Sequence, residues 1–173
     1  SSIQNYTEKQ QIELLLAIPY DKVVANTSVA EKLYLNALNQ AKQLKDKEAE
    51  ADIYSQLALV NYFLGNFDKR LTYDLKAVKI YETLNKKTKA GATYAGLGFA
   101  MKTRDIDKAK LYMQKGIHEL EKAEDYVTLN SVYDNYGIVQ EIAGNLDSAI
   151  YYYNKALELK RNQNDSIGIP FAL

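Results

Sequence analysis

The sequence predicts an all-α fold in which antiparallel helix pairs repeat along the chain. Small residues recur at spacings of 40, 39 and 40 residues, in the order Ala37, Ala77, Gly116 and Ala156. Seven residues before each of them lies a second series, Ala30, Arg70, Ala109 and Ala149. A fixed period of this size is typical of stacked copies of one supersecondary unit. Only two prolines and eight glycines occur, and no segment alternates with period two, so we expect long helices and no strands.

The first helix is expected over Glu8–Ile18, where Pro19 stops it, and Tyr20–Asn26 is expected to form a connection. Apolar residues at helical spacing then predict one helix followed by three helix pairs. These are expected at about 28–45, 47–64 with 67–84, 88–103 with 106–123, and 126–143 with 146–162.

The turn inside each pair carries its own signal. Gly65-Asn66 and Gly144-Asn145 break the first and third pairs, whereas Arg104-Asp105 replaces this break in the middle pair. The loop of the middle pair is one residue shorter, which accounts for the spacing of 39.

We expect one domain over residues 1–173. A divergent first unit, 1–46, precedes three repeats at 47–85, 86–125 and 126–164, and 165–173 begins another repeat with a helix near 165. Terminal repeats of a solenoid need a hydrophilic outer face, and this last segment lacks one. We therefore expect the natural chain to continue past Leu173, and uncapped repeat ends to favour self-association.

Composition excludes several classes of partner. The chain is 47% hydrophobic and 25% charged, so it can bury a core, and 22 basic residues balance 22 acidic ones. Zero net charge removes the general attraction to phosphates, so neither a nucleic acid nor an anionic membrane is expected as a partner. There is no cysteine, and the longest apolar run, Leu14–Pro19, is far too short to insert into a membrane.

Three segments resemble the tetratricopeptide repeat (TPR) family, over about residues 28–173. The copy that fits best reads Tyr133, Tyr136-Gly137, Gln140, Gly144, Ala149, Tyr153 and Ala156. The others read Tyr54, Leu57-Ala58, Gly65, Asp74 and Ala77, and then Tyr94, Leu97-Gly98, Met101, Ala109, Met113 and Gly116. The resemblance implies a right-handed superhelical solenoid. Arg70 and Asp74 depart from the pattern, and the closing proline is missing, so the second helices can run on to give units near 40 residues.

The ladder of small residues is interpreted as packing, because helix axes approach closely where small side chains meet. Tyr54, Tyr94 and Tyr133 share one repeat position and are expected to pack between helices. The run Tyr151–Tyr153 cannot face one way on a helix, so at least one of its rings should be exposed.

No catalytic or metal constellation stands out, and we predict a non-enzyme without a cofactor. His118 is the only histidine and is expected on a helix surface. Asp105-Ile106-Asp107 lacks the rest of a calcium loop and is expected to cap a helix. Gly91–Gly96 lacks the Lys-Ser/Thr of a phosphate loop. Charged stretches at Lys86–Lys89 and Glu119–Asp125 are interpreted as solvated surface.

The TPR resemblance implies a concave binding surface on the first helices of the repeats. By matching the copies, it holds Ser55, Leu59, Tyr62, Ala95, Phe99, Lys102, Asp134, Ile138 and Glu141. The Lys, Asn and Arg with which some TPR proteins grip a C-terminal carboxylate are absent from the matching positions. Leu59, Phe99 and Ile138 would suit an amphipathic helix or an apolar peptide. Alternatively, later repeats or the protein's own C-terminal helix cover this surface.

Three functional readings follow. The Gly-Asn-Phe/Leu-Asp turns and the tyrosine-rich second helices are similar to those of TPR sensor regions of bacterial histidine kinases and transcription regulators. This resemblance implies a signalling module with a protein or peptide partner and an extracytoplasmic location. The alternatives are a cytoplasmic peptide-sensing TPR regulator and a pure assembly scaffold. The sequence does not name the ligand.

Overall fold

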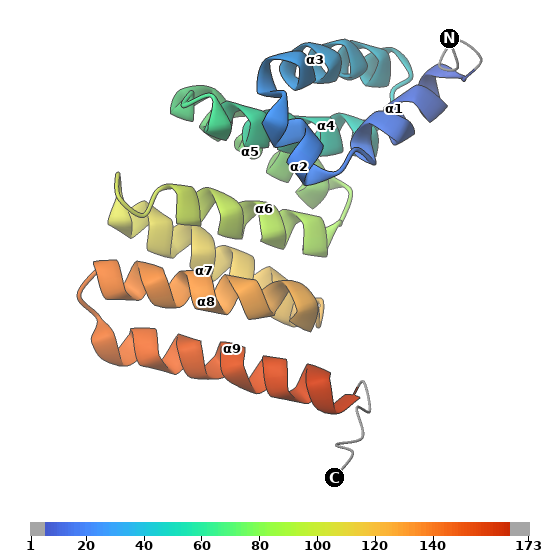
Figure 1. Cartoon of the computed structure of the whole chain (residues 1–173). Coiled ribbons are helices and arrows are strands. Elements are labelled where there is room, and N and C mark those ends of the chain that lie inside the picture. Colours follow the sequence, from blue (N-terminus) through green and yellow to red (C-terminus); the bar gives the residue numbers. More distant parts are fainter. Residues whose placement is uncertain (1–5, 167–173) are drawn as a thin grey trace. The chain divides into compact units, whose positions relative to one another are not determined.

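The computed structural model describes the backbone of residues 6–166 and the side chains of residues 6–163, and this part of the chain is helical with no strand (Figure 1). The all-α prediction is confirmed. The helices are α1 (Glu8–Leu16), α2 (Tyr20–Ala25), α3 (Thr27–Gln43), α4 (Lys47–Phe63), α5 (Phe67–Thr83), α6 (Lys87–Ala100), α7 (Ile106–Lys122), α8 (Tyr126–Ile142) and α9 (Leu146–Ser166). They form two compact units, Ser1–Lys86 and Lys87–Leu173.

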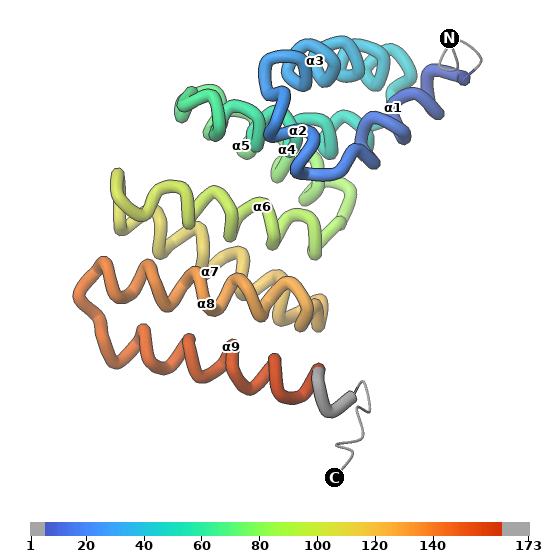
Figure 2. Tube along the Cα trace, in the orientation of Figure 1, coloured from blue at the N-terminus to red at the C-terminus, as the bar shows by residue number. Residues whose placement is uncertain are grey.

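In unit 1, α4 and α5 form an antiparallel hairpin, α3 packs along α4, and α1 contacts both α3 and α4 (Figure 2). The core is filled by fully buried side chains from α3 and α4, among them Tyr34, Ile53, Leu57 and Val60. Asn61 is buried with them, and its amide donates to the Leu57 carbonyl at 2.9 Å. The same amide lies 3.3 Å from the Glu31 carboxylate of α3, and its oxygen accepts from the Asn66 side chain at 3.3 Å, so the buried polar group is satisfied.

In unit 2, the hairpins α6–α7 and α8–α9 stack so that α8 contacts both α6 and α7 (Figure 2). Leu97, Met113, Leu120, Leu129 and Val139 are fully buried there. The two helices of each hairpin thus pack on each other, and the hairpins pack together through α8, as expected of a repeat array.

The ladder of small residues lies where helices cross, as predicted. Ala37, Ala77 and Ala156 are 3%, 0% and 0% exposed. A Cβ added to Gly116 would lie 2.6 Å from the Gly91 carbonyl oxygen and 2.7 Å from the Ala95 nitrogen. The backbones of α6 and α7 therefore approach so closely that no side chain fits at Gly116.

The Gly-Asn breaks also form as predicted. Gly65 and Gly144 have φ of 74° and 79°, and the amides of Asn66 and Asn145 close each turn by donating to carbonyls five residues back, at 2.8 Å in both cases. This is the Schellman arrangement, which favours glycine. In the connections outside the hairpins, the same left-handed position is held by a residue with a side chain: Lys45 (φ 56°) after α3, Asn85 (φ 55°) after α5 and Glu124 (φ 53°) after α7.

The turn of the middle hairpin accommodates the missing residue in a different way. We predicted that the helix runs to 103, but α6 ends at Ala100 and loose turns follow, with Met101 N donating to Gly98 O at 3.0 Å and Arg104 N to Met101 O at 2.9 Å. None of the residues 101–105 has a positive φ. The deletion is therefore absorbed by the last turn of α6.

Two further expectations need correction. The predicted connection Tyr20–Asn26 contains the short helix α2, which starts after Pro19 and buries Val23 at 3% exposure. Proline suits a helix start because its φ is already fixed near the helical value. At the other end, α9 continues through Asp165 to Ser166, so no new helix begins near 165. Residues 167–173 lie outside the described residues.

Candidate functional site

The predicted binding residues of unit 1 lie along α4. Leu59 is half-buried, and the Ser55 hydroxyl lies 3.3 Å from the Tyr81 hydroxyl of α5. Tyr62 is 51% exposed; its ring meets Phe63 edge-on at 5.1 Å between centroids, and the Arg70 guanidinium lies 4.7 Å above it. These residues form a mixed aromatic and polar surface of unit 1.

The predicted residues of α6 do not all reach the surface. Ala95 is 3% exposed and lies against Gly116, so it belongs to the helix crossing and offers nothing to a ligand. Phe99 is half-buried, and the Lys102 ammonium lies 4.1 Å from the centre of its ring. Lys102 therefore covers one face of Phe99 through a cation–π contact.

On α8, the polar predicted residues are already engaged within unit 2. Asp134 accepts from Lys160 of α9 at 2.7 Å, and Glu141 accepts from the Tyr153 hydroxyl at 2.9 Å. Ile138, between them on the helix, is 36% exposed. The polar groups thus hold α9 against α8, and the apolar side chain stays open to solvent.

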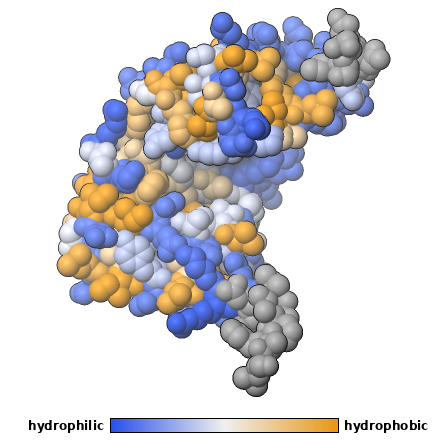
Figure 3. All heavy atoms as spheres, in the orientation of Figure 1, coloured by the Kyte–Doolittle hydropathy of each residue, from blue (hydrophilic) through white to orange (hydrophobic). Residues whose placement is uncertain are grey.

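Within unit 2 these residues define a surface that we call the α6/α8 face: Phe99, Lys102, Ile138, Glu141 and Ile142. Ile142 is 48% exposed and was missed by the sequence reasoning, although it follows Ile138 by one helical turn. Figure 3 shows hydrophobic residues gathered over the end of α8 and the start of α9, at the left of the view. Leu59 lies in unit 1, so only the part of the predicted surface on unit 2 is counted in this face.

Each hairpin contains the same Tyr-Tyr-Lys cluster, which the sequence reasoning only partly anticipated. Tyr54, Tyr94 and Tyr133 are buried between helices, as predicted, and each packs on a tyrosine of the second helix at 5.9, 6.1 and 5.9 Å between ring centroids. A lysine three residues later lies 5.5, 4.2 and 4.7 Å from the first ring. The clusters are Tyr54/Tyr73/Lys76, Tyr94/Tyr112/Lys115 and Tyr133/Tyr152/Lys155. Lysines recurring at the repeat period are the signal that could have found them.

Glu121 links the last cluster to α7. Its carboxylate accepts from the Tyr133 hydroxyl at 2.5 Å and from the Lys155 ammonium at 3.2 Å. Burial raises the pKa of Glu121, but these two bonds outweigh it and hold the pKa below its ordinary value. Burial and the bond to Glu121 raise the pKa of Tyr133 to about 12. Glu121 is exposed, as expected of solvated surface, and it also connects α7, α8 and α9.

Arg70 and Asp74, the two departures from the repeat pattern, form an ion pair. Their side chains are 15% and 10% exposed, and Arg70 Nε lies 3.3 Å from Asp74 Oδ2. Burial raises the pKa of Asp74 to about 6, although Arg70 lowers it. Both departures were noted from the sequence, and their spacing of four residues on a helix could have predicted the pair.

The structure places the residues that were considered for catalysis on α6 and at α7. His118 is exposed on α7, and the Asp105 carboxylate caps α7 by accepting from the Lys108 amide at 3.0 Å. Gly91 lies inside α6. Among the described residues, no group of three or more His, Cys, Asp or Glu could hold a metal ion, and no helix has the length and apolarity to cross a membrane.

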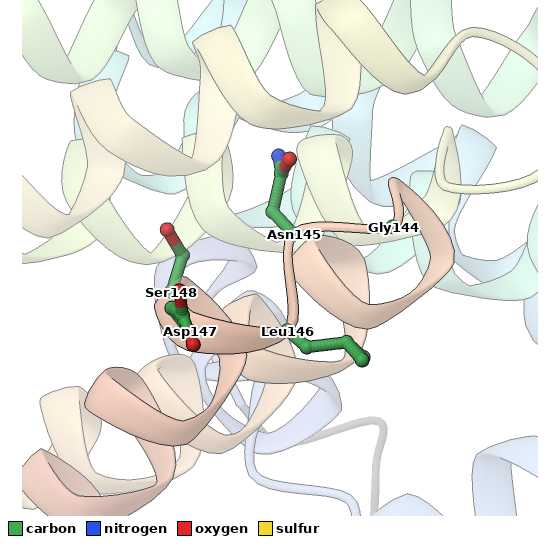
Figure 4. Close-up of a pocket in the computed structure, with 5 residues that line it drawn as sticks. All are labelled: Gly144, Asn145, Leu146, Asp147 and Ser148. Carbon is green, nitrogen blue, oxygen red and sulfur yellow. The ribbon is translucent and has the colours of Figure 1, made fainter.

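A surface hollow of about 500 Å³ lies at the turn between α8 and α9. It is lined by the five consecutive residues Gly144–Ser148, whose side chains point in different directions (Figure 4). The side-chain amide of Asn145 donates to the side-chain oxygen of Gln140 at 2.9 Å. Without converging groups, this hollow does not have the features of a ligand site.

The comparisons with known proteins bear on the fold. No family model and no curated protein matches the chain. Among solved structures, BtubC (BKLC) from P. vanneervenii superposes with a TM-score of 0.79 over 93% of this chain and 67% of that one. The chain shares the BtubC fold. Sequence identity with BtubC is 20%, so the likeness extends to the helical architecture and to nothing finer.

Proposed function

We propose that this chain is a non-catalytic interaction module of the TPR type, which binds an amphipathic helix or an apolar peptide on the α6/α8 face. The observation that carries the proposal is that the polar side chains of α8 contact α9, whereas its apolar side chains are exposed. Asp134 and Glu141 are engaged by α9, whereas Ile138 and Ile142 are exposed at 36% and 48% with no such role. A surface whose polar groups are satisfied internally gains most from an apolar partner.

The position of Lys102 indicates which charge the partner should carry. The Lys102 ammonium lies 4.1 Å from the centre of the Phe99 ring and donates to the Phe99 carbonyl oxygen at 3.5 Å. A carboxylate on the incoming peptide would draw the ammonium away from the ring and free that ring for contact. We therefore propose an apolar helical stripe with an acidic residue at its edge.

The wider setting rests on the sequence resemblance. We propose that the chain is the sensor or scaffolding region of a larger bacterial signalling protein, and that it is extracytoplasmic if it is a membrane sensor. A cytoplasmic peptide-sensing regulator and a pure assembly scaffold are the alternatives, and all three share the same kind of protein or peptide partner.

The test uses a phage library of amphipathic helical peptides selected against the whole chain. A selected peptide is then titrated calorimetrically into the wild-type protein and into the Phe99→Ala and Ile138→Ala variants. Truncating a central apolar contact should weaken binding by about tenfold or more. The thermal unfolding of each variant is measured alongside, so that a folding defect is recognised.

Leu111→Ala is the matched control, because Leu111 is 62% exposed on α7 of the same unit. Its affinity should equal that of the wild type. Selected peptides that bind Phe99→Ala and Ile138→Ala as tightly as the wild type would contradict the proposal, and so would a library that yields no peptide above background.

A further inference from the structure

The helix α9 leaves one side open to solvent along its length. Ala149 and Ala156, 2% and 0% exposed, lie on the other side, where α9 packs along α8 (Figure 1). With 3.6 residues per turn, seven exposed residues of the open side fall within about 60° of one line along the helix. We call them the α9 stripe: Asp147, Ile150, Tyr151, Asn154, Leu157, Glu158 and Arg161.

The equivalent helix of the preceding hairpin, α7, is covered at two of these positions. Leu157 is 44% exposed, whereas Ile117, at the same repeat position, is 6% exposed in α7, along which α8 packs. Ile150 is 59% exposed, whereas Lys110 at the same repeat position is half-buried. The α9 stripe therefore presents apolar side chains at positions that are covered in α7, and it carries isoleucine where α7 carries lysine.

The residues of the α9 stripe are ordered so that a second copy in the antiparallel direction complements them. Asn154 lies at the midpoint. Ile150 precedes it by four residues and Leu157 follows it by three, so a twofold axis near Asn154 places Ile150 of each copy against Leu157 of the other. Asp147 and Arg161 lie seven residues to either side, so the same axis places opposite charges together at both ends. Among the described side chains, neither Asp147 nor Arg161 takes part in an ion pair.

We propose that two copies of this chain associate through their α9 stripes, antiparallel and around a twofold axis near Asn154. The apolar side chains form the centre of the contact and the two Asp147–Arg161 pairs form its rim, which is the usual arrangement of an interface. A contact between identical faces closes on itself, so it gives a dimer and not a filament. The α9 stripe shares no residue with the α6/α8 face, so this dimer does not rest on peptide binding there.

Sedimentation equilibrium of the whole chain from about 5 μM to about 500 μM tests the proposal. One helix of each copy makes a small interface, so we expect a monomer–dimer equilibrium with a Kd of about 10–100 μM. Leu157→Glu should weaken association by about tenfold or more, because it puts two carboxylates into the apolar centre. Leu111→Glu is the matched control, since Leu111 is 62% exposed on α7, and it should associate as the wild type does. Thermal unfolding shows whether each variant is folded.

Charge reversal distinguishes the twofold arrangement from other contacts of α9. Asp147→Arg and Arg161→Asp each place like charges together across the axis and should weaken association by about threefold to tenfold. The double variant Asp147→Arg/Arg161→Asp carries opposite charges at these positions again, in every copy. It should recover the Kd of the wild type.

A cysteine at the axis tests the geometry. The chain has no cysteine of its own, so Asn154→Cys supplies a single thiol, which should form a disulfide between two copies under mild oxidation. His118→Cys is the matched control, because His118 is exposed on α7 and lies outside the α9 stripe. It should give little cross-linked dimer.

Four results would overturn the proposal. They are a wild type that stays monomeric at about 500 μM, a folded Leu157→Glu variant that associates as the wild type does, a double charge variant that associates no better than the single ones, and equal cross-linking of the two cysteine variants.

Discussion

Arg70 Nε and Asp74 Oδ2 lie 3.3 Å apart in the α4–α5 hairpin, with both side chains mostly buried. The equivalent positions of the next hairpin hold Ala109 and Met113, both 0% exposed. Unit 1 has therefore replaced an apolar contact with an ion pair at the same place. Because removing charges from water is costly, the pair adds little net stability while making each partner depend on the other.

The first prediction concerns pH. The pKa of Asp74 is raised to about 6 in the folded protein, above the value near 3.8 that it has in the unfolded chain. Between these two values the folded state holds a proton that the unfolded state has released, so this group lowers stability as pH rises. Its contribution to the free energy of unfolding should be about 1 kcal/mol more favourable at pH 5 than at pH 7.

Urea unfolding of the wild type and Asp74→Asn at pH 5, 6 and 7 checks this. Asparagine cannot titrate, so the stability difference between the two proteins should change with pH in the stated direction. Every other titratable group is present in both proteins and is common to the two measurements. A difference that is constant over this range would show that Asp74 titrates below pH 5.

The second prediction distinguishes the stability contribution of the Arg70–Asp74 ion pair from the contributions of its two residues. Arg70→Ala should destabilise the protein by about 3 kcal/mol at pH 7, because it leaves the Asp74 carboxylate buried without its cation. The double variant Arg70→Ala/Asp74→Met copies the middle hairpin and should regain wild-type stability or exceed it. Chemical denaturation of Arg70→Ala, Asp74→Met and the double variant measures the coupling between the two residues. Additive losses would mean that the two residues act independently.

The third prediction compares two glycines of unit 2. Gly116→Ala should destabilise by about 1–3 kcal/mol, since the new Cβ would lie 2.6 Å from the Gly91 carbonyl oxygen. Gly96→Ala is the matched control, because a Cβ on this exposed residue of α6 meets nothing within 4 Å. Alanine there should stabilise the helix by about 0.5–1 kcal/mol. Thermal unfolding of both variants suffices, and equal effects would contradict the close approach at Gly116.

Much of the fold could be predicted because the repeat period appears in the sequence at packing positions. The ladder residues, the Gly-Asn turns and the long helices need only local rules. The short helix α2 could not be predicted, because six residues with one buried side chain, Val23, show no periodicity. The loosened end of α6 was also missed, since a one-residue deletion can be placed in a loop or in a helix and only packing decides which.

The candidate site was harder to predict, because exposure is a property of the packed structure. Ala95 fitted the binding stripe by its position, and the close approach of Gly116 buried it. Asp134 and Glu141 looked available until α9 supplied Lys160 and Tyr153.

The left-handed residues of the turns differ in a way that bears on how the chain assembles. Within two hairpins this position is glycine, which adopts the conformation at no steric cost, whereas Lys45, Asn85 and Glu124 hold it in the connections outside the hairpins. A residue with a Cβ needs about 1–2 kcal/mol to take this conformation. We therefore expect these hairpins to close on their own and the junctions to bend only when neighbouring helices dock. Cooperativity along each unit is then governed at Lys45 and Glu124 as well as on the helix faces.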